Sequence, residues 1–526
     1  MAPVINVDFQ NCFIFILLCF FSILYYFLLF KKPKLDCDLP PSPPSLPIIG
    51  HLHLLISVLI HKSFQKLSSK YGPFLYLRIF NVPMVLVSSS SIAFEIFKTQ
   101  DVNVSFRGLP PVGESLLFGS STFLMAPHGD YWKFMKKLTV TNLLGSQALE
   151  RSRGIRADEL ERFYKNLLDK AIKNESVEIG NEAMYLSNNI IFKMLMGRSS
   201  WEEDDEAERA RGLVIESFAL FKKLFLATLL RRPLEKFGIS LFKEEIMSVS
   251  RRFDELLERI LVEHEEEKPS EHQGSDMMDV LLDAFRDENA EYKITRNHIK
   301  SFFIELFIAG TDSVGQTTQW TMAEIINNPN ILERLRDEID SVVGTSRLIQ
   351  ETDLPNLPYL QAVVKEGLRF HPPAPVLART FQEGCKIGGF YVPEKTTLIV
   401  NVYAVMRDPD SWEDPNEFKP ERFLASSISE QDEERREQTL KYIPFGSGRR
   451  GCPGANLAYI FIETAVGMMV QCFDWKIKGD KVNMEEVAGG MNLAMAHPLK
   501  CTPVPRAPNP LASILQQEML RLNLDV

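Results

Sequence analysis

Residues 445–454 read Phe-Gly-Ser-Gly-Arg-Arg-Gly-Cys-Pro-Gly, a glycine-rich loop in which one cysteine follows two arginines. Glycine lets the backbone adopt conformations that other residues avoid and approach a flat cofactor closely. The backbone N–H groups of such a loop, with Arg449 and Arg450 nearby, favour the thiolate form of Cys452 over the thiol. A surface turn that happens to hold a buried cysteine would have a similar composition. The residue types alone therefore leave both interpretations open.

The spacing within the loop decides between them. Glycine, arginine, cysteine and a second glycine stand three, five, seven and nine residues after Phe445, as Gly448, Arg450, Cys452 and Gly454. This pattern resembles the haem-binding loop of the cytochrome P450 family. The resemblance implies haem b as the cofactor and Cys452 as the axial thiolate ligand of its iron. It also implies that Phe445, Arg450 and Gly454 belong to the cofactor-binding site.

Three further segments stand in the order in which that family has them, so the resemblance extends over nearly the whole chain. Residues 309–313 (Ala-Gly-Thr-Asp-Ser) resemble the oxygen-activating segment of the family's long central helix. Glu366 and Arg369 match its Glu-x-x-Arg pair, and residues 420–423 (Pro-Glu-Arg-Phe) supply Arg422 as a second arginine. The resemblance implies a mainly α fold with small β-sheets, the cytochrome P450 fold.

Glu366 and Arg369 lie three residues apart, so on a helix they share a face and can pair. On an exposed surface such a pair contributes about 0–1 kcal/mol. The resemblance implies instead a buried network of Glu366, Arg369 and Arg422 that fixes the loop bearing Cys452. We expect this network to support folding and haem retention rather than chemistry.

The segment that leads into residue 309 is apolar enough to be buried on most sides. A charge at Asp312 then needs a reason, because an unpaired carboxylate in a dry core costs several kcal/mol. One alternative is that Asp312 is salt-bridged or solvated at a helix kink. Gly310 leaves room for a ligand, however, and the hydroxyls of Thr311 and Ser313 stand beside the carboxyl. We therefore expect these side chains to pass protons to bound dioxygen.

Ser313 departs from the family's usual pattern, which has threonine at this position. Serine keeps the hydroxyl but lacks the methyl group that restricts the rotamer. We expect proton delivery to survive with more leakage to peroxide.

Anionic haem propionates require cationic or hydrogen-bonding partners. Trp132 and Lys136 are spaced as Trp-x-x-x-Lys and match the family's Trp-x-x-x-Arg element, while Arg379 and Arg450 match its other propionate contacts. Lysine acts as a point charge without the bidentate fork of arginine. Arg107 is a further candidate for this group.

Composition is that of an ordinary globular enzyme. The chain has 526 residues, of which 45% are hydrophobic, so it can bury a large core. A net charge of −10 without a sustained Lys/Arg block argues against nucleic acid as a partner. The seven cysteines form no regular framework, which argues against a disulfide-stapled secreted domain.

Residues 11–30 carry no charge and are long enough to cross a hydrocarbon core of about 30 Å as a helix. A cleaved signal peptide is the alternative, but a basic segment before the apolar run and a small-residue cleavage pattern after it are both missing. Three lysines within residues 31–34 follow the span, so the body of the protein should stay cytosolic. We expect a single-pass protein of the endoplasmic reticulum membrane.

The predicted organisation has five parts. They are a lumenal N-terminus (1–10), a transmembrane anchor (11–30), a basic and proline-rich hinge (31–50), a haem-binding catalytic domain (51–505) and a C-terminal tail (506–526). Alternation of β-branched residues predicts a small hairpin sheet within residues 72–90. Helical periodicity predicts helices near 149–173, 184–196, 207–224, 242–265, 277–286, 297–328 and 329–342.

The resemblance implies a monooxygenase that inserts one atom of O2 into an apolar small molecule. No flavin- or NADPH-binding domain follows residue 505, so electrons from NADPH must come through a separate NADPH-cytochrome P450 reductase. Two other functions remain open: a haem-thiolate isomerase or dehydratase that needs no reductase, and a non-catalytic haem-binding protein.

Segments 371–375 and 442–446 resemble the plant group of the family. Segments 471–475 and 503–505 resemble subfamilies that oxidise triterpenoids or flavonoids. The family's cavity-lining stretches are largely apolar here, which favours a bulky, weakly polar substrate, a triterpenoid first and a flavonoid second. The apolar residues of these stretches include Leu116, Leu117, Phe118, Phe123, Leu124, Phe302, Ile308, Val376, Leu377, Met491 and Leu493.

Overall fold

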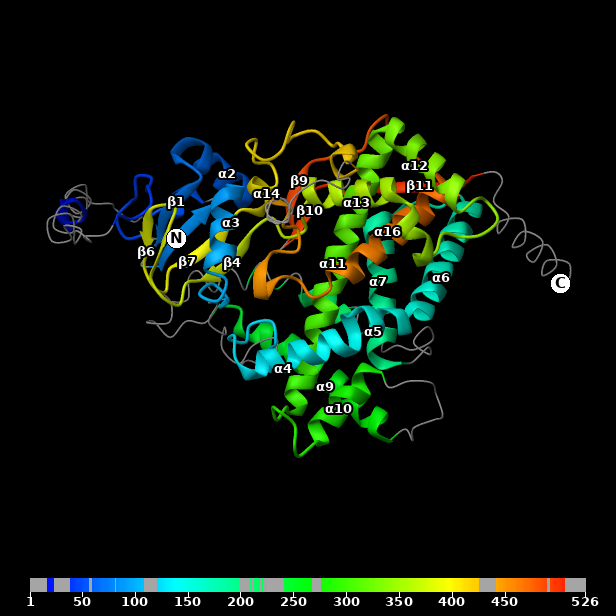
Figure 1. Cartoon of the computed structure of the whole chain (residues 1–526), viewed down its shortest axis with the longest axis horizontal. Helices are drawn as coiled ribbons and strands as arrows, with labels where there is room; N and C mark the ends of the chain where they lie inside the picture. The colour runs from blue at the N-terminus through cyan, green and yellow to red at the C-terminus, as the bar shows by residue number, and fades with distance from the viewer. Residues whose placement is uncertain are drawn as a thin grey trace, which may run out of the picture.

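The structure is a computed structural model, shown in Figure 1, that describes most of the chain. The described residues are 17–22, 38–55, 59–80, 82–107, 121–197, 209, 212–217, 220, 223, 241–266, 276–424, 441–489 and 492–506. Helices dominate one side of the molecule, while β1, β4, β6 and β7 gather at the other end, as Figure 1 shows. The predicted mainly α fold with small sheets is confirmed.

The longer described helices follow the chain from the strand-rich end into the helical body. They are α2 (Ile60–Tyr71), α3 (Ser90–Thr99), α4 (Asp130–Thr139), α5 (Ser146–Arg151), α6 (Arg153–Ile172), α7 (Ile179–Met196), α9 (Lys243–Glu266), α10 (Met277–Arg286), α11 (Arg296–Asn327), α12 (Pro329–Val342), α13 (Pro358–Phe370), α14 (Val402–Val405) and α16 (Ala455–Cys472). Short helical turns add η1 (Leu52–Leu54), η3 (Val140–Leu144), η4 (Glu351–Asn356), η5 (Pro420–Phe423) and η6 (Gly448–Arg450).

The strands form four small sheets. They are β1 (Phe74–Ile79), β2 (Val82–Val87), β3 (Val177–Glu178), β4 (Leu377–Thr380), β5 (Cys385–Ile387), β6 (Phe390–Val392), β7 (Thr397–Val400), β8 (Phe473–Ile477), β9 (Glu486–Gly489), β10 (Asn492–Met495) and β11 (Lys500–Pro505). The predicted hairpin within residues 72–90 exists as antiparallel β1 and β2. It is extended by β7, which pairs in parallel with β2, and by β4.

Most predicted helices are confirmed within a few residues. The helices predicted at 277–286 and 329–342 have those bounds. The segment predicted at 149–173 is two helices, α5 and α6, separated at Ser152. The helix predicted at 207–224 lies only partly within the described residues.

Helix α11 runs through the helical core. Its N-terminus is capped by the Thr295 side chain, which accepts a hydrogen bond from the backbone N–H of His298. Gly315 permits close packing on α7, since a Cβ atom there would lie 2.8 Å from the backbone oxygen of Gly180. This packing places the middle of α11 against α7 on one face and leaves the opposite face for the candidate site.

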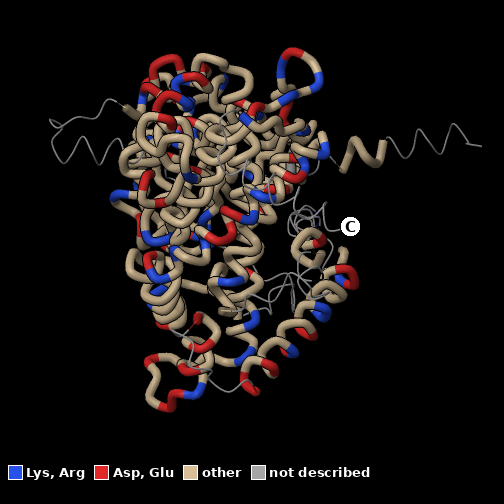
Figure 2. The backbone as a smooth tube through the Cα atoms, turned by 90° about the vertical axis from the view of Figure 1, so that its right-hand side faces the viewer, with Lys and Arg blue, Asp and Glu red and all other residues tan. Residues whose placement is uncertain are grey.

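Two hydrophobic cores meet at that site. The larger core joins the helical body through residues such as Phe303, Leu368 and Phe461. A second core holds the strand-rich end through residues such as Val400 and Ile443. Lys and Arg are interspersed with Asp and Glu along the described backbone, as Figure 2 shows.

The predicted membrane span lies mostly outside the described residues. Its described part, residues 17–22, is helical and exposes the large apolar side chains of Leu17, Leu18, Phe20 and Phe21. Among the described helices, α16 has a length and hydropathy that would suit a membrane crossing. Most of α16 is buried inside the protein, which is typical of a core helix.

Candidate active site

The cysteine loop is held in a tight turn before α16. The backbone N–H of Cys452 donates to the carbonyl of Phe445 at 2.9 Å. Gly448 adopts a φ of +70°, and a Cβ atom there would lie 2.1 Å from a carboxylate oxygen of Asp101. That carboxylate accepts the backbone N–H of Arg449 at 2.9 Å, so the glycine allows a second segment to lock the loop. Cys452 itself is exposed.

The charge environment of Cys452 differs in part from the prediction. Desolvation by the surrounding protein raises the pKa of the Cys452 thiol, while the backbone N–H of Gly454 and the positive charge of Arg107 lower it. The cation that acts on the sulfur is thus Arg107, not Arg449 or Arg450. The expectation that Arg449 and Arg450 favour the thiolate was wrong, because both side chains turn away toward other partners.

Three buried arginines converge beside the loop. An isolated bridge between Phe106 and Thr380 brings Arg107 next to Arg379 of β4. Desolvation and the neighbouring guanidinium groups lower the pKa of Arg379 to about 9. Desolvation and Arg107 lower the pKa of Arg450 to about 10.

This cluster fits an anionic cofactor. The Nε atom of Arg107 is buried and has no hydrogen-bond partner, and mutual repulsion destabilises all three cations. An anion placed among them would satisfy the orphaned donor and relieve the repulsion. Haem carries two propionates, so Arg107, Arg379 and Arg450 with the thiolate of Cys452 match its chemistry. Arg107 belongs to the cluster as fully as the two arginines that match the family pattern.

Trp132 and Lys136 of α4 lie next to this cluster. The Trp132 ring centroid is 4.7 Å from the guanidinium carbon of Arg450 and 4.8 Å from the Lys136 ammonium nitrogen. Lys136 donates to the carbonyl of Arg449 at 3.0 Å. The structure therefore brings both predicted residues to the loop, with Lys136 holding its backbone.

The glutamate–arginine network is buried. Glu366 and Arg369 are both 0% exposed and form two hydrogen bonds, of 2.7 and 2.8 Å. Glu366 also accepts from Arg422 at 3.1 Å and from the backbone N–H of Lys419 at 2.8 Å. Arg369 donates onward to the carbonyl of Met406 at 2.8 Å. The surface-pair alternative is excluded by this burial.

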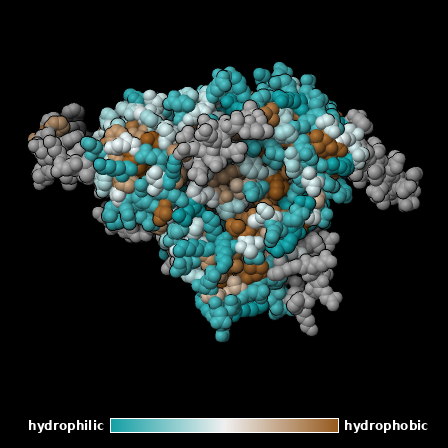
Figure 3. Space-filling model, in the orientation of Figure 1, coloured by the Kyte–Doolittle hydropathy of each residue, from teal (hydrophilic) through white to brown (hydrophobic). Residues whose placement is uncertain are grey.

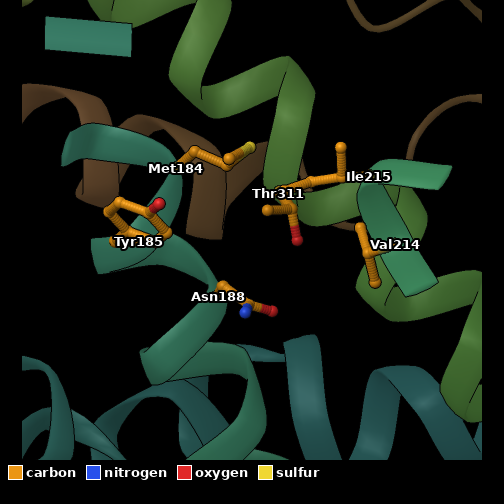
Figure 4. A pocket seen from close by; sticks show the side chains of 6 residues that line it. All are labelled: Met184, Tyr185, Asn188, Val214, Ile215 and Thr311. Carbon is orange, nitrogen blue, oxygen red and sulfur yellow. The ribbon is translucent and has the colours of Figure 1, made fainter. Parts of the chain in front are cut away.

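The oxygen-activating segment of α11 divides between two faces. The Thr311 hydroxyl donates to the carbonyl of Phe307, and Thr311 is 2% exposed. Figure 4 shows Thr311 at a pocket that it shares with Asn188 of α7 and Val214. Thr311 therefore does not join Ser313, whose hydroxyl donates to Ala309 on the other side of the helix.

The space expected at Gly310 is not a ligand space. A Cβ atom at Gly310 would lie 2.3 Å from Cδ1 of Ile191, so this glycine admits α7. The exposed residue of the segment is Ala309. The opening for a ligand thus lies one residue earlier than predicted, because a step of one residue turns the side chain by about 100° around a helix.

Asp312 is neither salt-bridged nor unpaired. One carboxylate oxygen accepts the side-chain amide of Gln316 at 3.2 Å, and the other accepts the side-chain amide of Asn492 on β10. Asp312 is half-buried beside this strand. The cost of placing a charge here is therefore met by two amide donors.

Glu305 is a site residue that the sequence argument missed. It lies one turn before Ala309, and burial raises its pKa to about 8, against hydrogen bonds from the backbone of Leu124 and Phe123 and the charge of Arg107. The N–H of Leu124 reaches both carboxylate oxygens, at 3.1 and 3.0 Å. The signal was present, since Glu305 is the one charge within the apolar run 302–308.

The predicted cavity wall is apolar where it is described. Phe123, Leu124, Val376 and Leu377 are half-buried. Figure 3 shows a hollow near the middle of this face with hydrophobic residues at its border. Phe302 and Leu493 are at most 1% exposed and pack in the core instead of lining the cavity. Other predicted lining residues lie outside the described residues: Leu116, Leu117, Phe118 and Met491.

Comparison with known proteins gives one consistent result. The family model described as Cytochrome P450 matches residues 40–500. Cytochrome P450 705A22 of Arabidopsis thaliana is 69% identical over 97% of this chain and 99% of its own length. A 3,9-dihydroxypterocarpan 6A-monooxygenase of Glycine max is 41% identical over 95% of this chain and 99% of its own length. A zebrafish cytochrome P450 solved with progesterone has a TM-score of 0.71 at 24% identity, covering 85% of this chain and 100% of that one.

Proposed function

The chain belongs to the cytochrome P450 family, and from this premise we propose that it hydroxylates an apolar, polycyclic plant metabolite, a triterpenoid in the first place. Membership makes the chain a haem-containing monooxygenase of plant specialised metabolism rather than an isomerase, a dehydratase or a non-catalytic haem protein. The substrate and the roles of individual residues are the subject of the proposal.

The residues divide the work into holding the cofactor and supplying protons. Haem with a thiolate ligand supplies the activation of O2 and the oxidation of an unactivated C–H bond. Cys452 provides the thiolate, and Arg107, Arg379 and Arg450 hold the propionates. Asp312 and Ser313 then carry protons from solvent into the cavity, while Thr311 supports the packing of α11 on α7.

The apolar wall carries the substrate class. Phe123, Leu124, Val376 and Leu377 offer half-buried hydrocarbon surface, and Ala309 is a small exposed residue on the facing helix. Such a wall binds a large apolar molecule through area and shape. The described cations near the cavity belong to the propionate cluster, so a charged substrate lacks a partner among these wall residues.

A phenolic polycycle is the second candidate. It is favoured by the similarity to the soybean relative, whose printed substrate is a dihydroxypterocarpan. A substrate of this kind carries hydroxyl groups that need hydrogen-bond partners when buried.

Family members draw electrons from a redox partner and use O2. We propose NADPH-cytochrome P450 reductase as that partner and the endoplasmic reticulum membrane as the location, with the catalytic body in the cytosol. The charge-free segment 11–30 and the lysines that follow it support this arrangement.

Substrate titration tests the proposal. Purified holoenzyme is titrated with a triterpene diol and, separately, with a dihydroxypterocarpan, and the Soret band is followed for the shift that accompanies loss of the iron-bound water. We expect a saturable shift with the triterpene diol and NADPH-dependent formation of a product heavier by one oxygen. A shift with the pterocarpan alone would overturn the order of the two candidates.

A further inference from the structure

The carboxylate of Asp312 is held by a residue from another part of the fold. Asn492 stands at the start of β10 and donates its side-chain amide to Asp312, 180 residues away in sequence. Gln316, one turn further along α11, donates to the other carboxylate oxygen at 3.2 Å. With both oxygens accepting, the Asp312 side chain is restricted to one orientation.

Strand β10 is rigidly attached to α11 next to this contact. The backbone N–H of Leu493 donates to the carbonyl of Pro373 at 2.9 Å. The carbonyl of Leu493 accepts the indole N–H of Trp320 at 3.1 Å. Trp320 in turn stacks on His371, with ring centroids 4.1 Å apart. Asn492 therefore approaches Asp312 from a fixed backbone rather than from a mobile loop.

The other strand of the hairpin is anchored as firmly. At the start of β9, Glu486 pairs with His61 at 3.1 Å and with Lys62 at 2.8 Å, both on α2. Opposite charges and hydrogen bonds from these partners lower the pKa of Glu486 to about 2 against its desolvation. The β9–β10 hairpin is thus tied to α2 at one end and to α11 at the other.

We propose that Asn492 is a positioning residue for proton delivery, which fixes the Asp312 carboxylate and makes its orientation depend on the β9–β10 hairpin. The inference rests on the proton-delivery role proposed above for Asp312. A carboxylate without Asn492 would sample several rotamers, so the correctly placed acid would be present for a smaller share of the time.

The consequence is measurable in how O2 is consumed without an organic substrate. Release of peroxide takes two electrons and two protons per O2, and complete reduction to water takes four of each. Poorly positioned protons favour the first outcome, which consumes one NADPH per O2, over the second, which consumes two. The ratio of peroxide to water formed therefore reports on proton delivery.

The first experiment compares Asn492→Leu and Asn492→Asp with the unmodified holoenzyme and its purified reductase. Leucine has a similar size but no donor, and aspartate adds a like charge beside Asp312. We expect the peroxide-to-water ratio to rise by roughly twofold to tenfold, more for aspartate, since positioning is part of the 10²–10⁴-fold that a general acid contributes. Haem content and the reduced carbon monoxide band should stay unchanged.

The exchanged pair, Asp312→Asn with Asn492→Asp, separates the contact from the chemistry. This double variant restores an amide–carboxylate hydrogen bond between the same positions but moves the acid onto β10. We expect its thermal stability to exceed that of Asn492→Asp alone, while its peroxide-to-water ratio stays high. This stability readout does not depend on turnover.

Asn327→Leu is the matched control. Asn327 donates to the carbonyl of Val482 at 3.1 Å and accepts its N–H at 2.8 Å, so it joins α11 to the segment before β9 far along the helix from Asp312. Its loss should lower stability and leave the ratio unchanged. Unmodified enzyme that does not consume NADPH and O2 would refute the proposed function itself. Normal consumption with an unchanged ratio in both Asn492 variants, or an equal rise in Asn327→Leu, would refute the role of Asn492 alone.

Discussion

Glu305 shows how much one buried carboxyl can constrain a site. It anchors the segment around Leu124 to α11 through two backbone contacts and lies close enough to Arg107 to feel its charge. Burial outweighs both effects and raises its pKa to about 8. At neutral pH the site therefore contains a carboxylic acid that is largely protonated.

The pH dependence of stability follows from this pKa. The unfolded chain releases the Glu305 proton near its usual value of about 4.3, while the folded chain keeps it up to about 8. The free energy of unfolding should therefore fall as pH rises through this window, by at most about 1.4 kcal/mol per pH unit from this group. Glu305→Gln should remove that part of the slope in chemical denaturation from pH 5 to pH 8, as values flagged roughly by the same window.

An exposed carboxyl provides the comparison. Glu161→Gln on α6 removes a solvent-exposed glutamate and serves as the matched control. A Glu305→Gln variant with the same slope as the unmodified protein would show that this carboxyl is ionised at neutral pH.

Cys452 is the other residue whose role is decided by one atom. Cys452→His replaces the thiolate with a neutral imidazole, which donates less electron density to iron. We expect loss of the far-red-shifted Soret band of the reduced carbon monoxide complex. Cys385→Ser, at a half-buried cysteine on β5, should keep the band. A normal band in Cys452→His would contradict the ligand assignment.

At the scale of elements, α13 acts as a clamp between the helical core and the loops that lead to Cys452. Arg369 binds backbone carbonyls at Met406, Pro415 and Glu417, and Glu366 binds the backbone N–H of Lys419. These contacts hold a long irregular segment that has little secondary structure of its own. The network therefore determines where the following loop lies.

Glu366→Gln should break this clamp. Loss of the negative charge leaves two arginine side chains, one fully buried, without their counter-charge, which costs roughly 3–5 kcal/mol. We expect a lower melting temperature and little bound haem, measured by the ratio of Soret to protein absorbance. Glu421→Gln on η5 removes an exposed pair with Arg334 and should cost only about 0–1 kcal/mol. Full haem occupancy in Glu366→Gln would refute the structural role.

At the scale of the whole molecule, the site lies where two hydrophobic cores meet. Cys452 precedes α16 of the helical core, while Arg379 belongs to β4 of the strand-rich core. A cofactor held by both would join the two cores, and its removal should lower stability by mass action. The described body is thus organised around the cofactor rather than around the membrane.

Truncation tests the proposed anchor on the same scale. Removal of residues 1–31 should shift much of the protein from the membrane to the supernatant fraction, because the apolar run 11–30 is then lost. The reduced carbon monoxide band should persist in the truncated protein. Retention of the whole population on membranes would refute residues 11–30 as the main anchor.

The sequence by itself determined the thiolate loop, the Glu366 network, the mainly α fold and most helix bounds, because each depends on spacing within a short segment. Even the membership of Trp132 and Lys136 in the site followed from a spacing of four residues. Local patterns of this kind survive in a single sequence since helices and tight loops translate residue number directly into geometry.

Only the tertiary structure decided which residues meet across the fold. Arg107 as the cation beside Cys452, Ile191 as the neighbour of Gly310, and Asn492 as the partner of Asp312 come from elements that are distant in sequence. A one-residue difference on α11 separates the face packed on α7 from the face that holds Ala309 and Ser313. Helix rotation and packing set that difference, and spacing along the chain does not encode them, because the contacts of a helix face depend on which other elements fold against it.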